Sequence, residues 1–159
     1  MKVLLAALNA KFVQSSLALR YLQLACKERG LTNTETAEYT INHNLYDIVG
    51  RIYAHRADAV GLSCYVWNIE MTLHVVDMVK AVRPDIKIIL GGPEVSFTAD
   101  EILNRCHAVD YVVQGEGEEA FYQLIKALTN GKDGITEEIA GVRGRHISGQ
   151  LMGSTETVE

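Results

Sequence analysis

Ile88-Ile89-Leu90-Gly91-Gly92-Pro93-Glu94 is an apolar run that ends on two glycines, and roughly twenty residues later Val112-Val113-Gln114-Gly115-Glu116-Gly117-Glu118 repeats the pattern. A short apolar run that stops at glycine is typical of a buried parallel strand followed by a tight loop. Glycine lets the backbone approach a ligand closely and adopt positive φ. Because ligands of open α/β sheets bind outside the carboxyl ends of the strands, the two loops predict a cofactor site more than a catalytic centre.

Strand and helix patterns alternate through most of the chain. The first helix begins near Ser15 or Ser16, and we expect its buried stripe to be Leu17, Tyr21, Leu24 and Ala25. Parallel strands need right-handed helical crossovers, so the α/β pattern predicts a flavodoxin-like (Rossmann-like) doubly wound parallel five-stranded sheet of order 2-1-3-4-5. The predicted strands are 3–8, 34–41, 59–63, 86–90 and 110–114, and the later helices are 45–55, 69–82, 99–106 and 118–128.

The last part of the chain departs from this alternation. Residues 139–143 and 146–151 are typical of a short C-terminal hairpin, which we expect to have no core of its own. We therefore predict a domain over residues 1–135, and a hairpin and linker over 136–159 that lead to a further domain absent from this chain.

Composition limits the possible classes of protein. The chain has 159 residues, of which 48% are hydrophobic and 22% charged, as expected of one domain with a substantial core. A net charge of −5 gives no support for a nucleic-acid partner. No apolar run approaches the roughly 18 residues of a membrane helix, and the first residues favour a strand over a signal peptide. Cys26, Cys64 and Cys106 are too scattered for a zinc site or a disulfide framework, so we expect a cytoplasmic protein.

The fold prediction brings particular loops to the switch point between the first and third strands. We expect residues 9–15 and 63–67 to wall a cleft there, continued by 91–94 and 114–118. The stretch 9–14 contains no glycine, which disfavours a dinucleotide site, and no phosphate-binding P-loop motif occurs. A phosphoacceptor receiver would need acidic residues where this chain has Asn9 and Ser63. Cys64 has no histidine near it in sequence and is a poor candidate nucleophile.

Three motifs together carry a family resemblance. Gly61-Leu62-Ser63-Cys64-Tyr65, Leu90-Gly91-Gly92-Pro93-Glu94 and Val113-Gln114-Gly115-Glu116-Gly117-Glu118-Glu119 resemble the N-terminal cobalamin (B12)-binding domain of B12-dependent radical SAM enzymes. That group includes anaerobic magnesium-protoporphyrin IX monomethyl ester cyclase-like proteins and radical SAM methyltransferase-like proteins. The resemblance spans Met1 to about Leu151.

The resemblance implies a cobalamin-binding module that presents cobalt to a downstream barrel of the same polypeptide. That barrel would hold a [4Fe–4S] cluster and S-adenosylmethionine, for methyl transfer or oxidative cyclisation. Its CxxxCxxC motif does not occur in this sequence. The present chain alone is therefore not expected to be catalytic, and the full-length protein is expected to be a radical SAM methyltransferase or oxidative cyclase.

The same resemblance implies the residues of the site, with no catalytic residue and no protein metal ligand among them. In relatives with DxHxxG after the first strand, the histidine binds cobalt; here Asn9, Lys11 and Gln14 would align, so we expect no such ligand from this loop. The implied cofactor-binding residues are Asn9, Lys11, Ser15, Ser63, Cys64, Tyr65, Gly91, Gly92, Pro93, Glu94, Gln114, Gly115, Glu116 and Gly117.

Alternatives remain open at this point. The missing histidine motivates a cofactor-free structural or docking domain of the same fold that has lost B12 binding. A flavodoxin-like domain for another small nucleotide is a third possibility. Ser63 either contacts a nucleotide tail or caps the next turn. Tyr65 and Trp67 either pack against the corrin or a further domain, or are ordinary residues of the core and rim.

Overall fold

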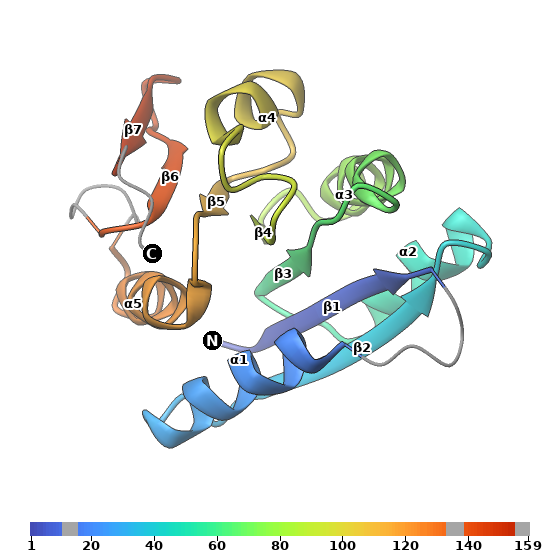
Figure 1. Cartoon of the computed structure of the whole chain (residues 1–159), viewed down its shortest axis with the longest axis horizontal. Helices are drawn as coiled ribbons and strands as arrows, with labels where there is room; N and C mark the ends of the chain where they lie inside the picture. The colour runs from blue at the N-terminus through green and yellow to red at the C-terminus, as the bar shows by residue number, and fades with distance from the viewer. Residues whose placement is uncertain (11–15, 133–138, 155–159) are drawn as a thin grey trace.

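The computed structural model describes residues 1–10, 16–132 and 139–154, and its sheet carries helices on both faces (Figure 1). The strands are β1 (Val3–Asn9), β2 (Thr34–Thr40), β3 (Ala59–Ser63), β4 (Lys87–Gly91), β5 (Tyr111–Val113), β6 (Val142–Arg145) and β7 (Leu151–Gly153). The helices are α1 (Leu17–Glu28), α2 (Leu45–Ala54), α3 (Ile69–Val82), α4 (Ala99–Arg105) and α5 (Gly117–Thr129).

The strands follow the order β2-β1-β3-β4-β5-β6-β7. Strands β1 to β5 pair in parallel, which confirms the doubly wound fold and the predicted order of its first five strands. The strand count differs from the prediction, because β6 and β7 pair antiparallel and extend the sheet beyond β5. Strands β6 and β7 are only four and three residues long, so their alternation of apolar and polar residues is too short to predict that the hairpin pairs with the sheet.

The C-terminal hairpin packs into the core of the main domain. Val142 pairs with Val113 and is 1% exposed. Arg143 holds α4 through two hydrogen bonds from its guanidinium to the Asp100 carboxylate, at 2.6 and 3.0 Å, and Arg145 donates to the Leu103 carbonyl. The interpretation of 136–159 as a route to a further domain stays a prediction.

Alternating side chains divide the core into two layers. On β1, Leu4, Ala6 and Leu8 belong to the same apolar cluster as the buried residues of α2, α3 and α4. Val3, Leu5 and Ala7 face the opposite way, toward α1 and α5. Figure 1 shows these two groups of helices on opposite faces of the sheet. Because both faces are covered, the central strands need continuous apolar runs, which is how the sequence could identify them.

Helix α1 is rotated relative to the prediction. Leu17, Tyr21 and Leu24, expected to be buried, are 63%, 61% and 53% exposed, whereas Leu19 and Cys26 are buried. Both stripes have helical spacing, so periodicity alone could not choose between them. The consequence is an apolar outer surface on α1, close to the carboxyl edge of the sheet.

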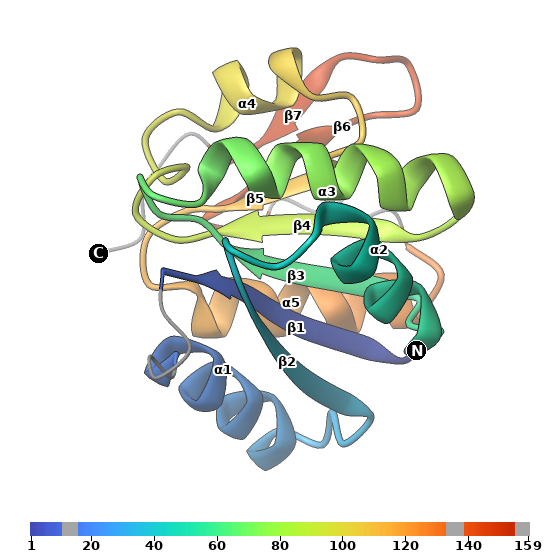
Figure 2. The ribbon, with the colours of Figure 1, turned by 90° about the vertical axis from the view of Figure 1, so that its right-hand side faces the viewer.

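The carboxyl ends of β1, β3 and β4 lie at one edge, where the loops that follow β3 and β4 also lie (Figure 2). The opposite edge carries the N-terminus, with a hydrogen bond from the Lys2 backbone N–H to Asp58. Within the described ranges, no helix combines the length and the apolarity that a membrane crossing requires.

The contact between the hairpin and α4 should depend on pH. The Arg143 guanidinium beside Asp100 lowers the pKa of that carboxyl in the folded state. The ion pair therefore stabilises the folded state fully above the usual aspartate pKa of about 4. This stabilisation is lost as the pH falls through the lowered pKa of Asp100 in the folded state. Because Asp100 is half exposed, Asp100→Asn should lower the free energy of unfolding by about 1 kcal/mol or less at pH 7.

Urea unfolding of both proteins at pH 7 and pH 3 checks this dependence. The difference between wild type and Asp100→Asn should shrink at pH 3. Equal differences at the two pH values would show that the ion pair does not anchor the hairpin.

Candidate cofactor-binding site

A cavity of about 470 Å³ lies between α1, α5 and the sheet, and opens toward the carboxyl edge. Leu5, Leu19, Ile89 and Phe121 line its inner part, all of them buried members of one apolar cluster. Residues of the loops after β3, β4 and β5 line its rim. The cavity therefore stands where the fold predicted a ligand.

A glycine in the middle of β3 makes room for this cavity. Leu5, Gly61 and Ile89 are neighbours in register across β1, β3 and β4. A Cβ on Gly61 would come within 3.2 Å of both Leu5 and Phe121. Two residues further along β3, Ser63 is the neighbour of Gly91 on β4, so the side chains at this position of the two strands are also small. The sheet is thus hollow between α1 and α5 because two neighbouring strands carry small residues on that face.

The two glycines after β4 have different roles. Gly92 has φ +102°, and a Cβ there would lie 2.6 Å from the Cys64 carbonyl oxygen. The Cys64 N–H also donates to the Gly91 carbonyl at 2.7 Å. Gly92 is therefore required by the packing of β3 against β4. At Gly91 a Cβ would meet no atom closer than the Val113 carbonyl, at 3.7 Å, so this glycine leaves open space beside the cavity.

Ser96 joins the loop after β4 to the loop after β5. Its buried hydroxyl donates to the Gly92 carbonyl at 2.9 Å and accepts from the Gly115 N–H at 3.2 Å. The Gln114 side-chain amide donates to the Ser96 carbonyl at 3.0 Å. Sequence reasoning did not single out Ser96, because a serine inside a loop carries no spacing signal.

Asn68 performs a similar task between β1 and β3. It is 1% exposed, and its side-chain amide donates to the Leu8 and Ser63 carbonyls, both at 3.0 Å. Its oxygen accepts from the Tyr65 N–H at 2.8 Å. The loop after β3 is thereby fixed, and the Tyr65 ring stacks on the half-exposed Trp67 ring at 4.5 Å, with 3° between their planes.

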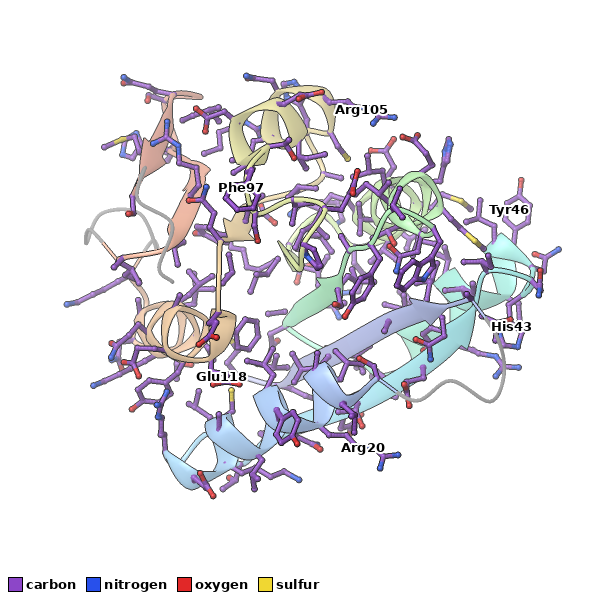
Figure 3. All side chains as sticks on the ribbon, in the orientation of Figure 1. Arg20, His43, Tyr46, Phe97, Arg105 and Glu118 are labelled. Atoms are coloured by element: carbon purple, nitrogen blue, oxygen red, sulfur yellow. The ribbon has the colours of Figure 1, made fainter. Side chains whose placement is uncertain are left out.

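The helices complete the walls. Glu118 lies in the first turn of α5. Among the described residues that line the cavity, it is the one with a charged side chain. Figure 3 shows it at the start of α5, far from His43 and Tyr46 near α2. Arg29 ties α1 to α5, with an ion pair to Glu119 at 2.8 Å and a position 5.2 Å from the centre of the Tyr122 ring.

The structure brings seven of the predicted site residues to the cavity: Ser63, Tyr65, Gly91, Gly92, Pro93, Gly115 and Gly117. Lys11 and Ser15 lie outside the described residues. The others do not line the cavity. Asn9 donates to Glu38 at 3.1 Å, Gln114 is buried, and Glu94 and Glu116 are exposed on their loops.

Cys64 is a packing residue. It is fully buried, and burial raises the pKa of its thiol to about 12. Such a thiol is protonated at neutral pH and is not a nucleophile. All three cysteines are free and buried, and the part of the chain that the structure describes contains no group of three potential metal ligands.

Sequence reasoning missed several lining residues. Gly61 stood inside a recognised motif, where a glycine among large apolar residues is itself a signal of close approach. Phe121 comes in the helix just after the second glycine loop and was missed, whereas Glu118 falls within the predicted wall 114–118. On α1 the cavity is lined by Leu17 and Tyr21 of the predicted stripe and also by Leu19 and Leu22, which the predicted stripe left out.

Replacing Asn68 by leucine should destabilise the protein. The change leaves the Tyr65 N–H and the carbonyls of Leu8 and Ser63 buried without this partner, so we expect a loss of about 3 kcal/mol in the free energy of unfolding. Asn44→Ala is the matched control, since Asn44 caps α2 on the surface and its loss should cost about 1 kcal/mol. Denaturant unfolding measures both, and equal losses would refute a special role for Asn68.

The two glycines after β4 should also respond differently. Gly92→Ala should lower the free energy of unfolding by about 2 kcal/mol or more, because of its positive φ and the nearby Cys64 carbonyl. Gly91→Ala should change it by about 0.5 kcal/mol or less, as expected of a site with free space. A larger loss at Gly91 than at Gly92 would contradict the roles assigned here.

Known proteins match parts of this chain. The model of the B12 binding domain family matches residues 3–125. A 2-(S-pantetheinyl)-carbapenam-3-carboxylate methyltransferase of Streptantibioticus cattleyicolor is 38% identical over 90 residues, which cover 56% of this chain and 13% of that protein. The cobalamin-dependent radical SAM methyltransferase TokK of Streptomyces tokunonensis is 37% identical over 68 residues, or 43% of this chain and 10% of that protein.

A solved structure shares the fold. The cobalamin-dependent S-adenosylmethionine radical enzyme OxsB, with aqua-cobalamin and S-adenosylmethionine bound, superposes with a TM-score of 0.79 at 20% identity. The match covers 99% of this chain and 22% of that one. The chain thus corresponds to less than a quarter of the length of each of these proteins. With the family model matched over most of its length and the cavity at the carboxyl edge of the sheet, this chain belongs to the B12-binding domain family.

Proposed function

We propose that the cavity between α1 and α5 receives the nucleotide tail of cobalamin, while the corrin ring lies across the carboxyl edge of the sheet. The observation that carries this proposal is the cavity itself, opened by Gly61 and Gly91 in a chain of the B12-binding family. A nucleotide with one aromatic base has the right shape to enter the cavity.

The residues of the rim fit this ligand. Gly91, Gly115 and Gly117 bring backbone close to the opening without side chains between them and a flat ring. The Ser63 hydroxyl can bond the tail, and the Glu118 carboxylate can accept from a ribose hydroxyl or a corrin amide. The negative charge of Glu118 disfavours a bare phosphate at the start of α5, so we place the phosphate of the tail away from that helix.

The chain's own residues bind and orient the cofactor in this proposal. None of the described residues that line the cavity is a histidine, in keeping with the absence of the DxHxxG motif. When bound, cobalamin supplies the cobalt chemistry, and the protein supplies placement. A cofactor-free docking domain is not favoured, because filling the space at Gly61 with a larger side chain would be a simple way to lose the cofactor, and that space is intact.

We further propose that the domain works with a radical SAM barrel of the same polypeptide, which holds the [4Fe–4S] cluster and S-adenosylmethionine. The similarity to TokK over part of the chain supports this. So does the exposure of Val66, Trp67 and Phe97 on loops at the carboxyl edge, where a second domain could cover a bound corrin. Unpaired cysteines also support a cytoplasmic location.

Equilibrium dialysis of the 159-residue chain against hydroxocobalamin tests the proposal, with flavin mononucleotide as the control ligand. We expect saturable binding of the corrinoid and none of the flavin. Gly91→Val should weaken cobalamin binding at least about tenfold, because the added methyl groups occupy space beside the cavity.

Gly50→Val is the matched control variant. Gly50 lies in α2, with no atom within 4 Å of an added Cβ, and should bind cobalamin as the wild type does. Absence of corrinoid binding by the wild type, or equal binding by the Gly91 and Gly50 variants, would refute the proposed site.

A further inference from the structure

Among the residues that the structure describes, none with a polar side chain lines the inner part of the cavity. Four of the described lining residues carry polar side-chain atoms, namely Tyr21, Ser63, Tyr65 and Glu118. Ser63 ends β3, Tyr65 follows it, and Glu118 is in the first turn of α5. Tyr21 is largely exposed on α1. All four therefore lie toward the opening or the outer surface.

The floor is made by different residues. Leu5, Gly61 and Ile89 form one row across the sheet, and Leu19, Leu22 and Phe121 approach from the helices. Gly61 precedes Ser63 by two residues, which is roughly 6.6 Å along a strand. The backbone groups of this row belong to the parallel sheet and are paired with neighbouring strands. A group that reaches the floor thus leaves the polar rim behind and meets only apolar side chains among the described residues.

We propose that this floor makes the domain selective for the base at the end of the corrinoid tail, favouring dimethylbenzimidazole over adenine. The inference rests on the proposed function, because it requires the tail to enter the cavity. It adds a specificity that corrin binding at the rim does not imply, since corrinoids with either base share the same macrocycle and the same phosphoribosyl link.

The selectivity follows from hydrogen bonding. Adenine carries an exocyclic amine and extra ring nitrogens, which lose water on entering the cavity and find no partner among these side chains. A buried donor or acceptor without a partner destabilises the complex. Dimethylbenzimidazole presents two methyl groups in the corresponding region, and their burial against Leu5, Leu22 and Phe121 is favourable. Both effects act in the same direction.

Gly61 sets how deep the base can go. A Cβ on this residue would press at 3.2 Å on the Leu5 methyl group and on the Phe121 ring. Both side chains are buried, so the free space next to them is the cavity, and they would yield into it. Gly61 is therefore the residue that keeps the floor open for a bicyclic base.

Three corrinoids separate the possible outcomes when each is titrated into the wild-type chain and followed by its visible absorbance. They are cobalamin, the corrinoid with adenine in place of dimethylbenzimidazole, and cobinamide, which has no nucleotide. We expect cobalamin to bind at least about tenfold more tightly than the adenine form, the effect of about one unpaired buried group. Cobinamide should bind more weakly than cobalamin as well.

The outcomes distinguish the two proposals. Equal affinities for cobalamin and the adenine form would overturn the selectivity while leaving the cobalamin-binding function intact. Equal affinities for cobalamin and cobinamide would show that the tail does not use the cavity, and would overturn both the selectivity and the proposed position of the tail while leaving corrinoid binding itself intact. Binding of none of the three would refute the proposed function and the selectivity together.

A floor variant tests the cause. Leu22→Gln places an amide among the lining residues and should reduce the preference for cobalamin over the adenine form. Leu31→Gln is the matched control, because Leu31 packs against the same apolar cluster and does not line the cavity. An unchanged preference in the folded Leu22 variant, or the same change in both variants, would contradict the proposed origin. The wild-type comparison decides the selectivity itself even if a variant fails to fold.

Discussion

The site depends on the close approach of two backbone segments, the end of β3 at Cys64 and the turn after β4 at Gly92. An added Cβ at Gly92 would lie 2.6 Å from the Cys64 carbonyl oxygen, so no side chain fits between them. The hydrogen bond from the Cys64 N–H to the Gly91 carbonyl keeps the two segments paired up to the last residue of β4. Since the strands stay paired to their ends, the loops leave from one shared edge, and the rim of the cavity follows from that edge.

Buried polar side chains keep this rim in one conformation. Asn68 holds the loop after β3 to the end of β1, and Ser96 holds the loop after β4 to the start of the loop after β5. Each satisfies backbone groups that a loop would otherwise expose to water. Loops fixed before a ligand arrives do not have to be ordered when it binds, and that lowers the entropic cost of binding.

Sequence patterns could identify the central sheet, because strands covered on both faces are apolar throughout and their parallel order follows from the helical crossovers. The glycine loops likewise indicated the correct edge of the sheet. What the patterns missed depends on three-dimensional packing. Either stripe of α1 could have faced the core, and the three-residue β7 gave too little periodicity. Gly61 gains its role from Leu5 and Ile89, which are neighbours in register but distant in the chain.

The stacked rings of Tyr65 and Trp67 give the molecule an optical property. The chain contains one tryptophan, Trp67, whose ring stacks on Tyr65, a residue that lines the cavity. Indole fluorescence from this protein therefore originates at the place where the ligand is proposed to lie. Most proteins average such a signal over several tryptophans scattered through the fold. Here the emission reports the surroundings of one loop, held by Asn68, and gives no information about the far face of the sheet.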